Sequence, residues 1–245
     1  RPVPKAEVWE AVSADSSGCS RKHCGDGRCF YQQARARIRT AQVIIVNHAL
    51  LFALVNAGGE TTGDGDARGV MFPDDCVVLD EAHTVPEVAT EHFGLALSSY
   101  GVDRALKHLF NPRTQRGLLR RLGGAEARQA VADALEAATR FFAFLDATLL
   151  AQQPVVRVRE PGVAEPLLDA PLEALHRLLS RIADKLEDGR DRDEVLDERQ
   201  RLKGIQAGLT EWLSLGEKSQ VYWAERGGKR QTIVTLRSAP IDVAP

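Results

Sequence analysis

Two groups of residues in this sequence have the types and spacing to do chemistry. The first is the run Asp80-Glu81-Ala82-His83, which directly follows the apolar stretch 76–79. An acidic residue at the carboxyl end of a buried strand can hold Mg²⁺ through water, and the next carboxylate can orient and deprotonate a water that attacks a phosphate. We therefore predict Asp80 as the Mg²⁺ ligand, Glu81 as the general base and His83 as a link to bound nucleic acid.

The adjacency of the two carboxylates supports this interpretation, because neighbouring acids resist being ionised together unless a divalent cation neutralises them. The alternative is that Asp80 and Glu81 only begin a helix, where acidic side chains interact favourably with the positive end of the helix dipole. The apolar run before them favours phosphate chemistry.

The second group consists of the cysteines Cys19, Cys24 and Cys29, spaced C-x4-C-x4-C. Clustered thiols in a chain without a secretory signal favour metal binding over disulfides. Thiolates at this spacing suit an iron-sulfur cluster or zinc, and either needs four ligands. The fourth ligand could come from outside the chain, or His23 could complete a zinc site. Cys76 is a poor candidate because it begins an apolar run.

Basic residues gather around these cysteines, although the formal net charge of the whole chain is only −2. Contact with a phosphate backbone requires a local positive patch of this kind. The predicted nucleic-acid contacts in this region are Arg21, Lys22, Arg28 and Arg35.

Residues Phe30–Ala41 have a pattern compatible with a helix. Arg35, Arg37 and Arg39 are spaced by two and cannot share one helix face, so part of this set belongs to a solvated helix surface. The two aromatic residues that open this segment could stack on bases or pack beneath the metal loop.

Two buried strands are expected to position the acidic run. Val43–Val46 is a continuous β-branched stretch of the kind found in parallel sheets, and the apolar segment 49–55, which follows Asn47 and His48, predicts a helix. The glycine-rich stretch Gly58–Gly69 predicts a mobile loop. Cys76–Leu79 predicts the second strand, which ends at Asp80.

A helical bundle is expected from about residue 98 onward, because apolar residues recur there at spacings of three and four. Prolines separate the first two helices, and the charged run 187–194 separates the second from the third. A β-hairpin around Gly227-Gly228 then follows. The three apolar stripes comprise Val131, Leu135, Ala138, Phe142, Leu145 and Leu149; Leu172, Leu175, Leu179, Ile182 and Leu186; and Leu202, Ile205, Leu209 and Trp212.

Composition agrees with a globular protein. The chain has 245 residues, of which 44% are hydrophobic, so a sizeable core can form. No apolar run approaches the roughly 18 residues of a membrane span, and the first residues lack a signal-peptide pattern. We therefore expect a soluble cytoplasmic protein that does not bind membranes.

The order of these motifs resembles the DinG branch of the XPD-like superfamily 2 helicases. In sequence order, the cysteine cluster is followed by CFYQQAR, VIIVNHALL, VVLDEAH and, near the far end, VYWAE and SAPIDV. The resemblance implies a 5′ to 3′ DNA helicase that uses ATP and Mg²⁺ and carries a [4Fe-4S] cluster. Its partners would be ATP and DNA, both single strands and forks.

Carried over position by position, the resemblance assigns three cluster ligands to Cys19, Cys24 and Cys29. It assigns the helicase acidic motif to Asp80, Glu81 and His83. Asn47 and His48 match the segment after the cluster domain, where a structural role and contact with DNA are both expected.

The fold class implied is α/β plus all-α. A partial RecA-like parallel sheet of the P-loop NTPase type would carry a cysteine-rich metal loop and a helical arch insertion. The expected boundaries are 1–40 for the iron-sulfur segment, 41–97 for part of the first motor domain, 98–218 for the arch and 219–245 for the β return.

The sequence also departs from the family pattern. It contains no G-x-x-x-x-G-K-[ST] phosphate loop, no cysteine upstream of Cys19 and no motifs of a second motor domain. We therefore expect an internal segment that is inactive alone and relies on the rest of the polypeptide. Two alternatives are a non-catalytic zinc module that binds nucleic acid and a helical scaffold that binds protein.

Overall fold

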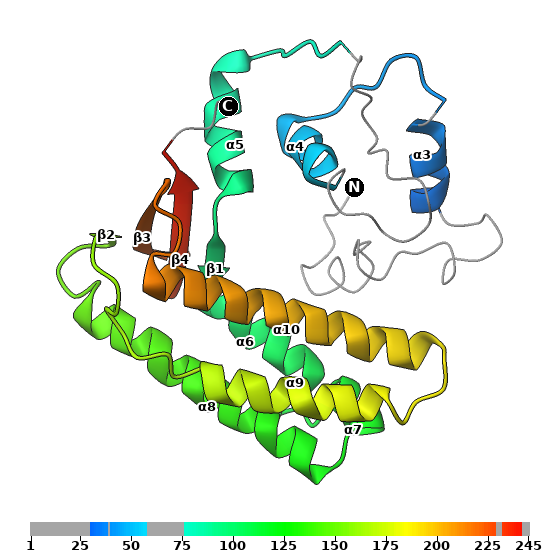
Figure 1. The fold of residues 1–245 in the computed structure, drawn as a ribbon, viewed down its shortest axis with the longest axis vertical. Helices are drawn as coiled ribbons and strands as arrows, with labels where there is room; N and C mark the ends of the chain where they lie inside the picture. The colour runs from blue at the N-terminus through cyan, green and yellow to red at the C-terminus, as the bar shows by residue number, and fades with distance from the viewer. Residues whose placement is uncertain (1–29, 39, 58–75, 229–231, 242–245) are drawn as a thin grey trace.

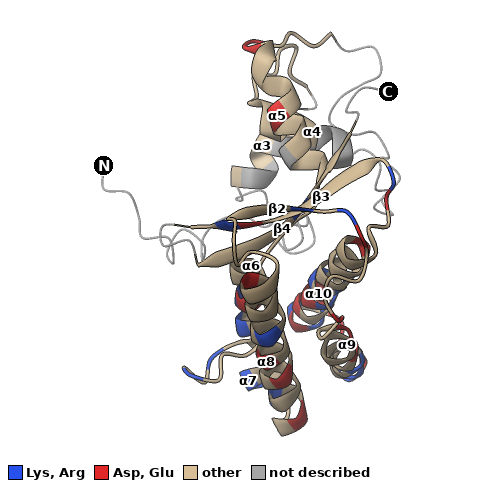
Figure 2. Cartoon of the chain, turned by 90° about the vertical axis from the view of Figure 1, so that its left-hand side faces the viewer, with Lys and Arg blue, Asp and Glu red and all other residues tan. Residues whose placement is uncertain are grey.

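The computed structural model describes residues 30–38, 40–57, 76–228 and 232–241 (Figure 1). This part of the chain forms a helical bundle, an antiparallel sheet and a group of three helices on the side of the sheet remote from the bundle (Figures 1 and 2). The predicted loop 58–69 lies outside these ranges. So do several of the predicted site residues, namely Cys19, Arg21, Lys22, Cys24, Arg28 and Cys29.

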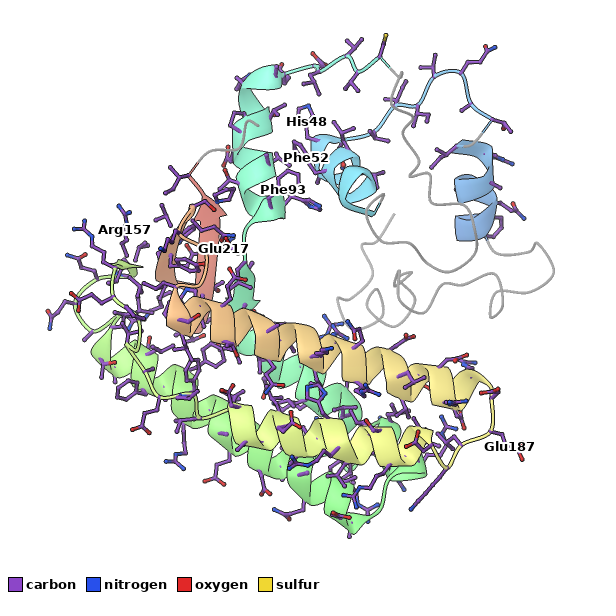
Figure 3. The ribbon with its side chains drawn as sticks, viewed as in Figure 1. His48, Phe52, Phe93, Arg157, Glu187 and Glu217 are labelled. Carbon is purple, nitrogen blue, oxygen red and sulfur yellow. The ribbon has the colours of Figure 1, made fainter. Side chains whose placement is uncertain are left out.

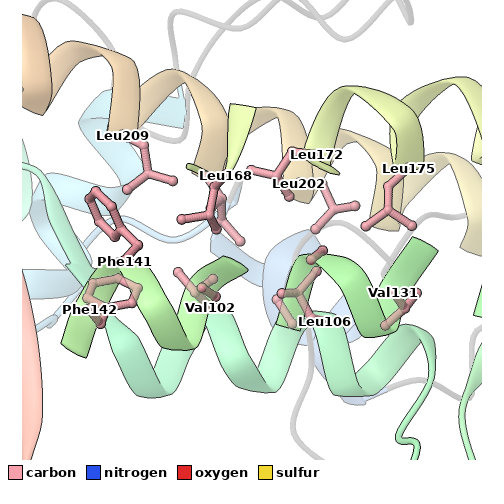
Figure 4. Close-up of a cluster of buried hydrophobic side chains, with 14 of the residues drawn as sticks. Val102, Leu106, Val131, Phe141, Phe142, Leu168, Leu172, Leu175, Leu202 and Leu209 are labelled. Carbon is pink, nitrogen blue, oxygen red and sulfur yellow. The ribbon is translucent and has the colours of Figure 1, made fainter. Parts of the chain in front are cut away.

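The bundle confirms the prediction made from the apolar stripes. Its long helices are α6 (Ser99–Leu109), α8 (Ala125–Thr148), α9 (Asp169–Ala183) and α10 (Arg190–Ser214), with the short α7 (Leu118–Leu122) at one end. Side chains from the four long helices interdigitate in one core (Figure 4). The buried stripe residues include Val131, Ala138, Phe142, Leu145, Leu172, Leu175, Leu179, Leu202, Leu209 and Trp212.

Two further findings refine the prediction of the bundle. Helix α6 was not predicted, although its apolar residues Val102, Leu106 and Leu109 are almost fully buried. The third predicted helix, α10, begins at Arg190, inside the charged run that was expected to be a connection.

The sheet has the strand order β1-β4-β3-β2, and all of its pairings are antiparallel. The predicted hairpin is confirmed: β3 (Gln220–Gly227) pairs with β4 (Ile233–Pro240), and Gly228 adopts a positive φ of 83° at the turn. The edge strands β1 (Ala96–Ser98) and β2 (Val155–Val158) were not predicted, because three or four residues are too few to show an alternating pattern.

The sheet packs one face on the bundle through alternate residues of the hairpin. Tyr222, Ala224, Val234 and Leu236 are buried on this face. Trp212 of α10 lies beneath them, and its indole N–H is directed at two strand carbonyls, each 3.2 Å away, those of Trp223 and Arg237. The bundle and the sheet therefore share one core.

The group of three helices beyond the sheet comprises α3 (Phe30–Ile38), α4 (His48–Ala57) and α5 (Val85–Phe93). Helix α3 confirms the helix predicted at Phe30–Ala41, although it ends three residues earlier. A close approach joins α5 to the sheet: a Cβ atom at Gly94 would lie 2.0 Å from the carbonyl oxygen of Ser238, so only glycine fits there.

The two strands predicted around the acidic run do not form. Within the described residues, Val43–Val46 and Cys76–Leu79 belong to no strand, and the described sheet is antiparallel. Val43, Ile45 and Val78 are 77%, 93% and 93% exposed, and Cys76 is exposed as well. The physical reason is that a parallel strand requires neighbouring strands for its backbone hydrogen bonds and helices over both faces. Neither segment has these neighbours among the described residues.

No helix within the described ranges has the length and apolar character needed to cross a membrane.

A contact between α6 and α10 joins an exposed histidine to a nearly buried carboxylate. Nδ1 of His108 in α6 lies 3.0 Å from Oε1 of Glu198 in α10, whose side chain is only 10% exposed. Arg201 lies 3.7 Å from the same carboxylate oxygen, and Glu194 adds a further negative charge nearby. The hydrogen bond to Glu198 raises the pKa of His108, and burial opposes it only in part.

We therefore expect the free energy of unfolding to fall as the pH rises through the raised pKa of His108. A histidine whose pKa is higher in the folded state contributes its full stabilisation below its unfolded pKa, about 6.5, and loses it above the folded pKa. Urea unfolding between pH 5.5 and 8.5 measures this loss. The variant H108Q should lack this component, and an unchanged pH profile in H108Q would contradict the assignment.

Candidate functional site

The acidic run forms a tight turn before helix α5. Glu81 has φ 50° and ψ 45°, a left-handed conformation that non-glycine residues seldom adopt, and η1, a short 3-10 helix, follows it at Ala82–Thr84. The backbone N–H of Glu81 donates to Oδ1 of Asp80 at 3.1 Å. Such a conformation at a chemically capable residue is a feature that functional sites often carry.

Neither carboxylate acts as a helix cap. Glu81 is the N-cap residue of η1 but makes no side-chain cap hydrogen bond, and the carboxylate of Asp80 is engaged one residue earlier. Both acids nevertheless directly precede η1 and α5, as the alternative that they begin a helix also predicts. Both side chains are exposed, so they are available to a cation and to phosphate oxygens.

His83 lies beside the second carboxylate. Its Nδ1 is 3.2 Å from Oε2 of Glu81, and the two side chains are 76% and 72% exposed. An ion pair this exposed contributes little to stability. The contact orients the Glu81 carboxylate, and a ligand that competes for either group could break it at small cost.

The turn is linked to the segment 47–48 by hydrogen bonds. Nδ1 of His48 lies 3.0 Å from Oγ1 of Thr84, and that hydroxyl donates its proton to the carbonyl oxygen of Glu81 at 3.0 Å. Asn47 caps helix α4, because its Oδ1 accepts the backbone N–H of Leu50 at 2.8 Å. The structure therefore brings His48 to the acidic turn and gives Asn47 a structural role.

Aromatic packing holds α4 against α5 directly below this contact (Figure 3). The ring of Phe52 meets the ring of Phe93 edge-on with centroids 5.3 Å apart, and it stacks on His92 at 6.2 Å. Edge-to-face pairs of this kind are favourable. The packing fixes the distance between the two helices and hence between His48 and Thr84.

An open hollow of about 850 Å³ lies between the segments that lead into α4 and into the acidic turn. Its walls are mostly aliphatic, from residues 43–46 and 76–79, while Asp80 and Glu81 lie at its border with His48 and Thr84. The hollow therefore combines an apolar wall with an acidic margin. The two carboxylates at this margin offer oxygen atoms of the kind that divalent cations take as ligands.

The other predicted site residues are not brought to this turn by the described part of the chain. Arg35 belongs to α3, whereas Arg21, Lys22, Arg28 and the three cysteines lie outside the described ranges. Among the described residues, no group of three or more His, Cys, Asp and Glu side chains could hold a metal ion.

Thr84 and Phe52 were missed by the sequence analysis. A threonine directly after the acidic run and an aromatic residue four positions after His48 carry no signal by themselves, because their partners are 36 and about 40 residues away. The helical spacing of His48 and Phe52, which places them on one face, was the only available indication.

Comparison with known proteins adds a second kind of observation, the similarity of the amino-acid sequence to other proteins. No protein-family model matches the chain. The chain is 32% identical over 98 residues to the ATP-dependent DNA helicase YoaA of Escherichia coli (strain K12). This match covers 38% of the chain and 14% of that relative. The chain is also 34% identical over 105 residues to the ATP-dependent DNA helicase DinG of Photobacterium profundum. This match covers 42% of the chain and 14% of that relative.

DinG of Escherichia coli (strain K12) is 30% identical over 86 residues, 35% of this chain and 11% of that relative. The matches to these curated relatives therefore span about one seventh of their length or less. They confirm the resemblance predicted from the order of the motifs.

Proposed function

We propose that this DinG-like chain is the part of an ATP-dependent DNA helicase that carries the acidic box and a helical arch. The observation that carries the proposal is the Asp80-Glu81 turn, with its left-handed Glu81 and its link through Thr84 to His48. The relatives named as ATP-dependent DNA helicases support it.

In the proposed site Asp80 holds Mg²⁺ through water, and Glu81 orients and deprotonates the water that attacks the terminal phosphate of ATP. The ion would supply charge neutralisation at the phosphates. The donor chemistry fits, since both carboxylates are exposed and Asp80 uses only Oδ1 within the turn. His83 and His48 flank the turn, and they would relay the state of the site toward bound DNA.

The proposed cofactor of the cysteine segment is a [4Fe-4S] cluster. Cys19, Cys24 and Cys29 would supply three thiolates, and the fourth ligand would come from elsewhere in the protein. The nearby basic residues Arg21, Lys22, Arg28 and Arg35 would contact the DNA backbone. A cytoplasmic location suits this proposal, because reduced thiols are maintained there.

The remainder of the motor would come from the rest of the same polypeptide. The sequence has no phosphate loop, so residues 41–97 would form only part of a first RecA-like domain, with 98–218 as the arch and 219–245 as the return. In that setting, neighbouring parallel strands would cover the exposed segments 43–46 and 76–79. Unwinding would proceed 5′ to 3′.

ATP hydrolysis by the full-length protein tests the proposal. We expect hydrolysis stimulated by single-stranded DNA, unwinding of forks with a 5′ overhang, and no hydrolysis by the 245-residue chain alone. Anaerobic metal analysis should find about four irons per full-length protein. A full-length protein without DNA-stimulated hydrolysis would overturn the helicase proposal, and one zinc without iron would overturn the cluster.

A further inference from the structure

Charge is distributed very unevenly over the bundle. Residues 99–128 contain seven Arg or Lys and two acidic residues, Asp103 and Glu126, whereas residues 129–218 contain twelve Arg or Lys and seventeen Asp or Glu. The basic residues gather on the lower half of α6, on α7 and on the loop between them (Figure 2). Because α6 leads away from the sheet, this basic end of the bundle is remote from the acidic turn (Figure 1).

The loop between α6 and α7 is held rigidly by its own hydrogen bonds. An isolated β-bridge joins Asn111 and Arg116, and the backbone N–H of Asn111 donates to the carbonyl oxygen of Arg116 at 2.7 Å. Oδ1 of Asn111 accepts the backbone N–H groups of Arg113 at 3.0 Å and Thr114 at 3.2 Å. The backbone of the loop therefore holds its residues in a defined arrangement.

Two backbone positions keep this arrangement. Gln115 has a φ of 55°, and its side-chain amide donates to the carbonyl oxygen of Pro112 at 2.7 Å. Gly117 has a φ of 132°, and a Cβ atom there would lie 2.5 Å from the carbonyl oxygen of Leu109. A loop that contains a left-handed non-glycine residue and an obligatory glycine is constrained well beyond what chain connection requires.

The loop directs unneutralised arginines at solvent. Arg113 and Arg116 are exposed, and neither forms an ion pair with any acidic residue that the structure describes. Arg120 is also exposed, and it donates to the carbonyl oxygen of Gln115 at 3.2 Å, which aligns it with the loop. Arg121, in contrast, is paired with Asp191 and Glu194 and serves the packing of the bundle.

The chemistry of this surface fits a nucleic-acid backbone. Arginine forks bind phosphate oxygens in a bidentate manner, and the hydrogen-bonded backbone of the loop sets the spacing between the arginines. No aromatic residue occurs between 111 and 124, and Phe110 is only 5% exposed, so bases have no stacking surface. A surface with phosphate contacts but no stacking favours duplex DNA, which has the higher charge density.

We infer that the loop 111–117 and the start of α7 form a second DNA site that binds the backbone of duplex DNA through Arg113, Arg116 and Arg120. The inference rests on the proposed helicase function, which supplies DNA as the partner. A site at the remote end of the bundle would contact the duplex that has not yet been unwound.

Binding of a fluorescein-labelled duplex of about 20 base pairs to the 245-residue chain, without ATP, tests this site. We expect the double variant R113Q/R116Q to weaken the affinity about tenfold and to reduce the slope of log K against log salt by about two, one for each lost phosphate contact. The variant R113K/R116K keeps both charges but loses the planar forks, so it should keep the salt slope of the parent chain and lose only part of the affinity.

The matched control is R140Q/R159Q. Both arginines are exposed, and their replacement changes the net charge by the same amount, so the affinity should change less than about twofold. Equal losses in the two double variants would overturn the site, as would an unchanged salt slope, tighter binding of a single strand of equal length, or no duplex binding by the parent chain. These outcomes leave ATP hydrolysis by the full-length protein untouched, so they are distinguishable from a failure of the proposed function.

Discussion

Replacing Glu81 with glutamine in the full-length protein should lower the rate of ATP hydrolysis by about a hundredfold or more, with little change in ATP affinity. A positioned general base contributes roughly 10²- to 10⁴-fold to a rate, and glutamine cannot accept the proton. Glutamine keeps the size of the side chain, so the left-handed turn and the Mg²⁺ position at Asp80 are preserved. Steady-state hydrolysis and equilibrium binding of a labelled ATP analogue measure the two quantities separately.

Glu87 provides the matched control for this change. It is an exposed glutamate in the first turn of α5, six residues after Glu81, so E87Q removes the same charge without touching the turn. We expect E87Q to hydrolyse ATP within about twofold of the parent rate, because salt screens the effect of an exposed charge outside the turn on the reacting groups. Hydrolysis by E81Q at a rate similar to that of E87Q would remove Glu81 from the chemical step.

The second large effect concerns Trp212, which joins the bundle to the sheet. W212A should lower the free energy of unfolding of the 245-residue chain by about 3–5 kcal/mol, the usual cost of removing a large buried aromatic side chain. Trp212 is 0% exposed, and its N–H is directed at the carbonyl oxygens of Trp223 and Arg237. Urea unfolding followed by far-ultraviolet circular dichroism measures the change.

Two further variants separate the causes of this loss. W212F keeps most of the apolar contact but leaves two strand carbonyls without their donor, so it should lose about 1–3 kcal/mol. F144A removes an aromatic side chain that is 46% exposed on α8, and it should lose less than about 1 kcal/mol. A loss in W212A no greater than that in F144A would show that the sheet and the bundle do not depend on each other.

The sequence alone determined the elements whose signals are local. The stripes around Val131, Leu172 and Leu202 repeat at helical spacing, and each stripe became a buried helix face. The hairpin was predictable because its turn and both strands lie within 21 residues. The cysteine spacing and the acidic run are also local patterns, and the order of these and the neighbouring motifs indicated the relatives that the comparisons confirm.

Only the tertiary structure decided which distant segments meet. The edge strands β1 and β2 pair with a hairpin that begins more than 60 residues later, and no local pattern encodes such a partner. The hydrogen bond between His48 and Thr84 likewise joins residues 36 positions apart, so it depends on the tertiary structure.

The dependence on distant partners also explains why the strands predicted at Val43–Val46 and Cys76–Leu79 do not form. Their apolar, β-branched composition indicates that they suit a buried parallel strand, but a strand forms only where neighbours accept its hydrogen bonds. Local sequence therefore determines what each segment is suited to become, and the surrounding chain determines whether it does, because backbone pairing and burial are supplied by residues far away in the sequence.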